Sequence, residues 1–244
     1  MRPCARAVCA LAMLVVMSAC SGGTASLFRQ YEYEEEIYLS LDGRATVYVN
    51  TSIAALNALR GTTFDASPAA RVDTTAVRAY YSSPATRVIR VSQSRRNNRR
   101  FVHVRLDVDD VTALGGVAPF AWSRYQFRRD GDLFKYLQTV GAAAAADVGN
   151  VGWNGSEIVA FRLHLPSKIR YHNTRRDVGR GNILVWEQSL TDRLHGVPIE
   201  LDARMDPQSI LYTTLWLFGI TFVAVAIAFG GVIWWVMRAP PALK

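Results

Sequence analysis

Residues 31–50 read YEYEEEIYLSLDGRATVYVN, two runs rich in aromatic and β-branched side chains with a turn between them. Tyrosine, isoleucine, valine and threonine are enriched in strands because they fit a pleated, half-buried surface. Asp42-Gly43 is a strong hairpin signal, since glycine readily adopts the positive φ that tight turns require. The stretch therefore predicts an antiparallel hairpin formed by residues 31–39 and 44–50.

Two short helices are expected after this hairpin. The first follows Ser52, a good N-cap residue, keeps apolar side chains at helical spacing and ends before Gly61. The second covers residues 73–81 and ends before a Ser-Ser-Pro sequence. Residues 141–146, a glycine followed by five alanines, have good helix propensity but no amphipathic pattern, so helix and loop both stay open there.

The remaining pattern is one of short strands that follow one another along the chain. The expected strands cover residues 86–92, 101–107, 121–128, 133–139, 157–165, 169–172, 183–188 and 199–205. Strands that come in consecutive hairpins, with helices in separate stretches, predict the α+β class and a mainly antiparallel sheet with a few short helices.

The C-terminal part carries a long apolar segment. Residues 210–237 contain no charged side chain, and 28 residues of helix are about 42 Å long, more than the ~30 Å hydrocarbon core of a bilayer. Arg238 and Lys244 follow this segment, so the positive-inside rule predicts a cytoplasmic C-terminus and an exported domain before the span. A buried core helix is the alternative, and the unbroken apolar length argues against it.

The N-terminal residues have the features of an export signal. Two arginines precede an apolar stretch at residues 7–17, which is too short to cross a bilayer. Residues 17–20, Met-Ser-Ala-Cys, are similar to a bacterial lipobox, with methionine where leucine is usual. We therefore expect acylation of Cys20; an ordinary secretory signal is the alternative.

These features divide the chain into five parts. The expected organisation is a signal peptide (1–19), a lipidated linker (20–30), an extracytoplasmic α+β domain (31–207), a transmembrane helix (208–237) and a cytoplasmic tail (238–244). The three cysteines all precede residue 21, which excludes a disulfide framework or a cysteine-ligated zinc site in the domain. Without the signal and tail the chain has 24 basic and 20 acidic residues, so nucleic acid is not an expected partner.

Four arginines at the end of the second expected hairpin are the candidate binding residues. Arg95, Arg96, Arg99 and Arg100 surround two asparagines at that tip. Guanidinium groups bind phosphate and carboxylate bidentately, so the expected ligand is an anionic lipid headgroup or glycan, or an envelope protein. The alternative is a solvated tip whose charges keep the sheet edge from aggregating.

Other titratable residues form no linear catalytic or metal-binding motif. Within the run Glu32, Glu34, Glu35 and Glu36, alternation predicts three carboxylates on one strand face, which is more often a solvated face than a cation site. His103, His164, His172 and His195 lack the spacing of a helical metal site, although the first two were candidates to meet across the sheet. We expect no metal and no cofactor.

Nucleophile motifs such as GxSxG and SxxK are also absent from the sequence. The chain is therefore expected not to be an enzyme. The alternative is a membrane-tethered hydrolase that acts on an envelope substrate through paired carboxylates, which leave no linear motif.

The layout resembles that of the LppM-like bacterial lipoproteins. The residues that carry this resemblance are Leu41-Asp42-Gly43 in the first hairpin, Leu165-Pro166 with Asn173 downstream, and the segment GNILVW at 181–186. The resemblance implies a lipobox signal, an α+β ectodomain and one C-terminal transmembrane helix, without established catalytic chemistry. It implies an envelope protein, and we expect a binding or interaction module at the outer face of the cytoplasmic membrane.

Overall fold

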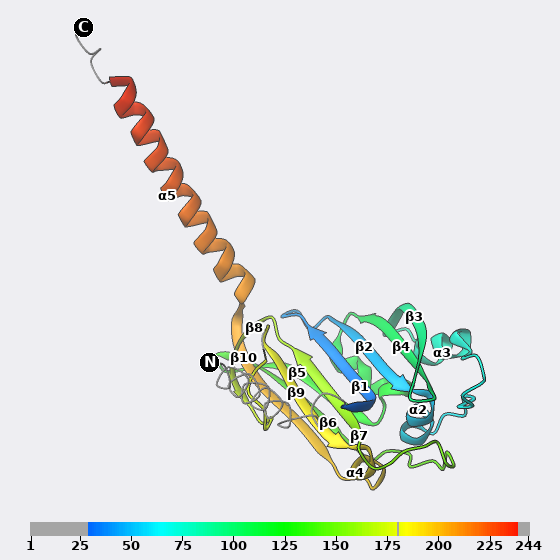
Figure 1. The fold of residues 1–244 in the computed structure, drawn as a ribbon. Helices are drawn as coiled ribbons and strands as arrows, with labels where there is room; N and C mark the ends of the chain where they lie inside the picture. Colours follow the sequence, from blue (N-terminus) through cyan, green and yellow to red (C-terminus); the bar gives the residue numbers. More distant parts are fainter. Residues whose placement is uncertain (1–28, 180, 239–244) are drawn as a thin grey trace, which may run out of the picture.

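The computed structural model describes residues 29–179 and 181–238 (Figure 1). Within these residues ten strands form two sheets, and one long helix leaves the domain. The mixed α+β class with mainly antiparallel pairing is confirmed. The expected signal peptide, the linker up to residue 28, Cys20 and residues 239–244 lie outside the described residues.

The larger sheet has six strands in the order β3-β4-β2-β1-β7-β9. Its strands are β1 (Gln30–Leu39), β2 (Ala45–Ser52), β3 (Thr86–Arg96), β4 (Arg99–Val108), β7 (Glu157–His164) and β9 (Ile183–Ser189). The β1–β2 hairpin forms as predicted, with Leu39 opposite Ala45. β1 also pairs in parallel with β7, which brings residues 30–38 beside residues 157–164.

The smaller sheet has four strands in the order β5-β6-β10-β8. They are β5 (Ser123–Asp130), β6 (Leu133–Val140), β8 (Ser167–His172) and β10 (Ile199–Ser209). The sequence predicted a mainly antiparallel sheet of hairpins, and the structure divides the strands between two such sheets. β7 is already paired on both sides, by β1 and β9, so β8 crosses to the second sheet and pairs with β10.

Both expected helices are present. α2 (Ile53–Arg60) begins where the Ser52 hydroxyl accepts a hydrogen bond from the Ala55 amide at 3.0 Å, and it ends at Gly61, whose φ is 68°. α3 covers Thr74–Tyr81. The described residues also contain α4 (Leu190–Leu194) and the 3₁₀ turns η2 (Val111–Gly116) and η3 (Ala118–Phe120). Residues 141–146 form no helix; two of their amides donate to carbonyls at the end of α2.

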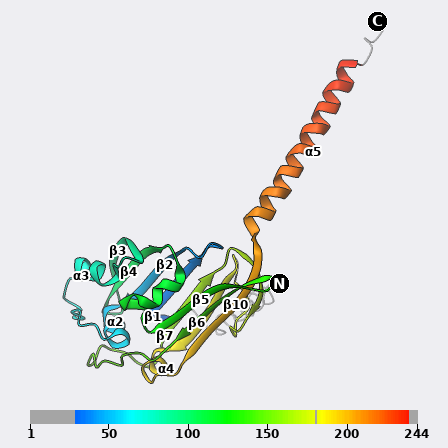
Figure 2. The ribbon, with the colours of Figure 1, turned by 180° about the vertical axis from the view of Figure 1, so that it is seen from behind.

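The core lies between the inner faces of the two sheets. Tyr33 on β1 contacts Trp122, which precedes β5, with ring centroids 5.3 Å apart. α2 and α3 lie beside the smaller sheet and cover the rest of the inner face of the six-stranded sheet (Figure 2). None of the described helices covers the outer face of the six-stranded sheet, so that face stays open to solvent (Figure 1).

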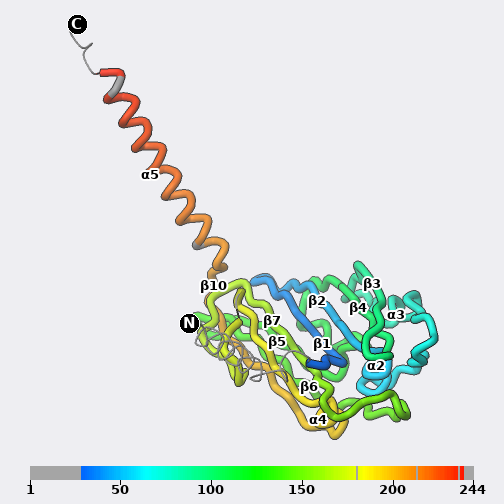
Figure 3. The backbone as a smooth tube through the Cα atoms, viewed as in Figure 1, coloured from blue at the N-terminus to red at the C-terminus, as the bar shows by residue number. Residues whose placement is uncertain are grey.

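α5 (Ile210–Arg238) continues directly from β10 and projects away from the domain (Figure 3). Its segment Ile210–Trp235 has a mean hydropathy of 2.3, and none of that window is buried in the protein. A core helix of a soluble domain would be mostly covered, so this helix has the length, composition and exposure of a membrane span. It begins two residues later than predicted, because Gln208 and Ser209 belong to β10.

Candidate functional site

The outer face of the six-stranded sheet is the candidate functional surface. Strand alternation points every second side chain outward, and many of these residues are polar or aromatic. They include Glu34, Glu36 and Tyr38 on β1, Thr46, Tyr48 and Asn50 on β2, His103, Arg105 and Asp107 on β4, and Arg162 and His164 on β7. A polar sheet face with several aromatic rings supplies both hydrogen bonds and flat contact surfaces to a ligand.

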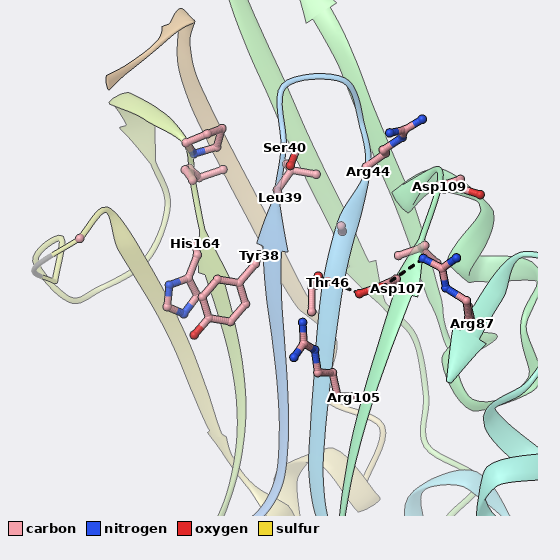
Figure 4. Close-up of a pocket in the computed structure, with 15 residues that line it drawn as sticks. Tyr38, Leu39, Ser40, Arg44, Thr46, Arg87, Arg105, Asp107, Asp109 and His164 are labelled. Carbon is pink, nitrogen blue, oxygen red and sulfur yellow. Dashed lines mark hydrogen bonds and ion pairs between the residues drawn. The ribbon is translucent and has the colours of Figure 1, made fainter. Parts of the chain in front are cut away.

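A pocket of about 630 Å³ lies at the end of this face where β1 and β7 finish (Figure 4). We call it the helix-side pocket; its lining includes Tyr38, Arg44, Arg87, Arg105, Asp107, His164 and Pro166. The Pro166 carbonyl accepts a hydrogen bond from the Ile210 amide at 3.1 Å, and Ile210 is the first residue of α5. The pocket is therefore next to the point where the chain enters the long helix.

Arg105 is the cation of this pocket without an acidic partner among the described residues. Its guanidinium carbon lies 5.7 Å from the centroid of the Tyr48 ring. Asp107, in contrast, is engaged by Arg87 at 3.4 Å and by the Thr46 hydroxyl at 2.9 Å. The lining also holds the carboxylate of Asp109, so three arginines and two aspartates face this pocket and its basic residues outnumber its acidic ones by one.

One wall of the pocket is held rigid by stacking. The rings of Tyr38 and His164 are parallel to within 15°, with centroids 3.8 Å apart. The His164 Nε2 lies 2.5 Å from the Glu36 carboxylate, and this hydrogen bond holds the pKa of Glu36 below its usual value. Glu36 therefore stays ionised and fixes the imidazole plane against Tyr38.

The arginine tip differs from its prediction. β3 and β4 run on to Arg96 and Arg99, so the turn between them is only Asn97-Asn98. Arg99 is 6% exposed and its Nη2 lies 3.0 Å from the fully buried Glu32, so the alternative of a solvated tip does not describe Arg99. Arg100 donates to the carbonyl of Pro68.

The tip also lies far from α5. β4 pairs with β2 so that Phe101 is opposite Ser52 and Val108 is opposite Ala45. The tip is therefore at the end of the sheet away from the β1–β2 turn, roughly 23 Å along the strands from the helix-side pocket. Binding by Arg95, Arg96 and Arg100 stays a prediction, but these side chains do not face a membrane that α5 enters.

The predicted carboxylate stripe is interrupted by a bulge. The β1–β7 register slips between Tyr31 and Tyr33, which leaves Glu32 as an extra residue that turns inward. Glu34 stays on the outer face and pairs with Arg162 at 2.8 Å, whereas Glu35 is buried between the sheets. Three carboxylates on one face were expected, and the bulge leaves two.

The four histidines do not form a cluster. His103 on β4 and His164 on β7 are separated by β2 and β1, so they do not meet across the sheet as suggested. His172 is at the end of β8, and His195 follows α4. Within residues 29–179 and 181–238 no group of three or more His, Cys, Asp or Glu residues has the geometry to hold a metal ion.

Sequence reasoning missed the helix-side pocket. Arg44, Arg87 and Arg105 come from a turn and two strands that are distant along the chain, and only the sheet order brings them together. The alternation of each strand was the one available signal. It predicts which side chains point outward, but it does not predict which strands are neighbours.

Comparisons with known proteins give one match. No protein-family model and no curated protein match the chain. The NMR structure of the folded domain of LppM from Mycobacterium tuberculosis is similar, with 14% sequence identity and a TM-score of 0.41, over 76% of this chain and 95% of that one. This is a weak resemblance in fold to an LppM domain, and it carries no argument about function.

Proposed function

We propose that this chain is a membrane-anchored binding module whose helix-side pocket recognises an anionic lipid headgroup at the outer face of the cytoplasmic membrane. The observation that carries the proposal is the hydrogen bond from Ile210 to Pro166, which ties the pocket to the start of α5. If α5 spans the bilayer, this pocket lies at headgroup level.

The orientation of the anchor is supported by the residues that flank it. Tyr212 and Trp216 lie near the start of α5, and Trp234 and Trp235 lie near its end, as in interfacial aromatic belts. Arg238 follows the span, whereas an acidic residue, Asp206, precedes it. The positive-inside rule then places the domain outside the cell and the C-terminus in the cytoplasm.

The chemistry of the pocket suits a phosphate group. Among the described residues the Arg105 guanidinium has no ion-pair partner, and Arg44 and Arg87 stand on two other elements of the same pocket (Figure 4). Arginine binds phosphate bidentately, and each basic residue near an anionic leaflet contributes about 1 kcal/mol. The pocket would hold the domain in one orientation on the membrane, since α5 already provides the anchorage.

Replacement of Arg105 with glutamine is expected to weaken headgroup binding about fivefold, which corresponds to the loss of ~1 kcal/mol. The measurement is calorimetric titration of the full chain in a neutral detergent with dihexanoyl phosphatidylglycerol, and with dihexanoyl phosphatidylcholine for comparison. Arg124→Gln, an exposed arginine on β5 of the smaller sheet and outside the pocket lining, is the matched control and should bind like the wild type. Equal affinity for both lipids, or equal loss in both variants, would contradict the proposal.

A second anchor at Cys20 is part of the same proposal. The lipobox-like residues 17–20 support cleavage before Cys20 and diacylation of its thiol, and two acyl chains are enough for stable anchoring. The intact mass of the mature protein is expected to carry a diacylglyceryl increment that Cys20→Ser lacks. A wild-type mass without this increment would leave α5 as the single anchor and would remove the lipoprotein assignment.

A further inference from the structure

Three outward side chains on neighbouring strands form a hydrogen-bonded chain at the other end of the outer face. The Nε2 atom of His103 lies 2.8 Å from the Ser94 hydroxyl, and its Nδ1 atom lies 2.9 Å from the Asn50 side-chain oxygen. Because an amide oxygen only accepts, Nδ1 must carry the proton. Nε2 then offers its lone pair to the serine, which is the polarity of a serine–histidine–asparagine triad.

The strand register explains how these residues meet. Asn50 on β2 is directly opposite His103 on β4. Ser94 on β3 is opposite Phe101, so it is the diagonal neighbour of His103 on the same face. The three residues come from three different strands, so they form no linear nucleophile motif that could be recognised in the sequence.

A small hollow of about 170 Å³ surrounds the serine. Its lining consists of Tyr31, Glu34, Asn50, Ser94, Arg96, Phe101 and His103. The Arg96 guanidinium is held 4.5 Å from the Phe101 ring centroid and donates to the Tyr31 carbonyl, so a positive group is fixed beside the exposed hydroxyl. The volume is that of about six water molecules, which is room for a short acyl group and too little for a fatty acyl chain.

We propose that this hollow is a hydrolytic site for short-chain carboxylic esters, with Ser94 as nucleophile, His103 as general base, Asn50 as its positioning residue and Arg96 as the group that stabilises the oxyanion. An ester fits better than an amide. Asn50 brings no negative charge to stabilise an imidazolium, so the reaction favours a leaving group that departs readily. The site shares no lining residue with the helix-side pocket, so ester hydrolysis here and headgroup binding there can be tested independently.

The reaction balances with water as the only co-reactant. The Ser94 oxygen bonds to the acyl carbon while its proton passes to Nε2 of His103, and the negative charge develops on the carbonyl oxygen beside Arg96. The tetrahedral intermediate collapses, the ester C–O bond breaks, and the alcohol leaves with the proton from His103. Water then attacks the acyl-serine with His103 again as base, which releases the carboxylic acid and restores Ser94.

The state of the base agrees with this role. Burial, and next the nearby Arg96 cation, lower the pKa of His103 below its ordinary value of 6.5. The imidazole is therefore neutral at pH 7 and able to accept a proton. Glu34 on β1 lines the same hollow and pairs with Arg162 on β7, whose guanidinium carbon lies 5.2 Å from the Tyr31 ring centroid. Arg105 stands two residues further along β4, with Arg90 of β3 opposite it.

The test is hydrolysis of p-nitrophenyl acetate by the full chain in detergent, with labelling by a fluorophosphonate as a second readout. Ser94→Ala is expected to lower kcat at least about 100-fold and to abolish the label. Ser92→Ala is the matched control, because Ser92 is opposite His103 in the register but is not hydrogen-bonded to the ring. This variant should hydrolyse p-nitrophenyl acetate, and react with the fluorophosphonate, as the wild type does.

The pH profile separates a catalytic role from a structural one. Wild-type kcat/KM is expected to rise with pH through the depressed pKa of His103, and Asn50→Asp should move this rise to higher pH, because a carboxylate stabilises the imidazolium. Three results would overturn the proposal: a wild type no faster than buffer, Ser94→Ala as active as Ser92→Ala, or a fluorophosphonate adduct mapped to another residue. Unchanged far-ultraviolet circular dichroism verifies that each variant is folded.

Discussion

Replacement of Arg99 with methionine is expected to lower the free energy of unfolding by about 3–5 kcal/mol. Glu32, its partner at 3.0 Å, is fully buried, so the variant would leave a carboxylate inside the protein without a compensating charge. Among the residues that the structure describes, the other hydrogen bond to the Glu32 carboxylate comes from the Trp153 indole and is long, at 3.4 Å. Arg99 also donates to the carbonyls of Val151 and Gly152, so its loss would release that loop from the sheet.

The measurement is urea unfolding of the full chain in detergent, followed by circular dichroism. Arg95→Met is the control from the same hairpin tip; Arg95 is exposed, and the change should stay within about 0.5 kcal/mol. The double variant Glu32→Gln/Arg99→Met should recover much of the stability, because no lone charge remains. Equal midpoints for Arg99→Met and Arg95→Met would mean that the ion pair does not support the fold.

Replacement of Glu35 with alanine is expected to cost about 3 kcal/mol, because several buried donors would lose their acceptor. The Glu35 carboxylate accepts hydrogen bonds from Tyr125 at 2.8 Å, Gln138 at 2.8 Å and Tyr33 at 3.1 Å, where the two sheets meet. Glu35→Gln keeps an acceptor for the first two, and the Tyr33 hydroxyl can rotate to accept from the new amide. Urea unfolding should therefore give the glutamine variant a clearly higher free energy of unfolding than the alanine variant.

The pH dependence of stability gives an independent check on Glu35. Burial raises its pKa above the ordinary value of 4.5, and this outweighs the lowering effect of the three hydrogen bonds. The folded protein thus holds the proton more tightly than the unfolded chain. The stability contribution of Glu35 is complete below pH 4.5 and is lost as the pH rises through the folded pKa. Glu35→Gln should lack this decline; an identical slope in both proteins would show that Glu35 titrates normally.

Local structure followed from short stretches of sequence. Asp42-Gly43 predicted the turn of the first hairpin, and Ser52 and Gly61 predicted the ends of α2; each signal acts within a few residues. The continuous apolar run from Ile210 likewise predicted a helix able to span a membrane, and its complete exposure confirms that the domain core does not use it. Such features depend on backbone preference and on apolar length, both of which are properties of the chain itself.

The candidate sites depended on register and strand order, which are decided by how distant segments pack together. A bulge buried Glu32 and made Arg99 its partner, so one of the four candidate binding arginines is engaged inside the protein. The sheet order likewise joined Asn50, Ser94 and His103, and it put Arg44, Arg87 and Arg105 around one pocket. Alternation determines the face on which a side chain lies, whereas its neighbours on that face are determined by pairing free energies summed over whole strands. Sequence alone thus determined most strands, two of the short helices and the membrane-length helix, and only the tertiary structure decided which polar groups meet.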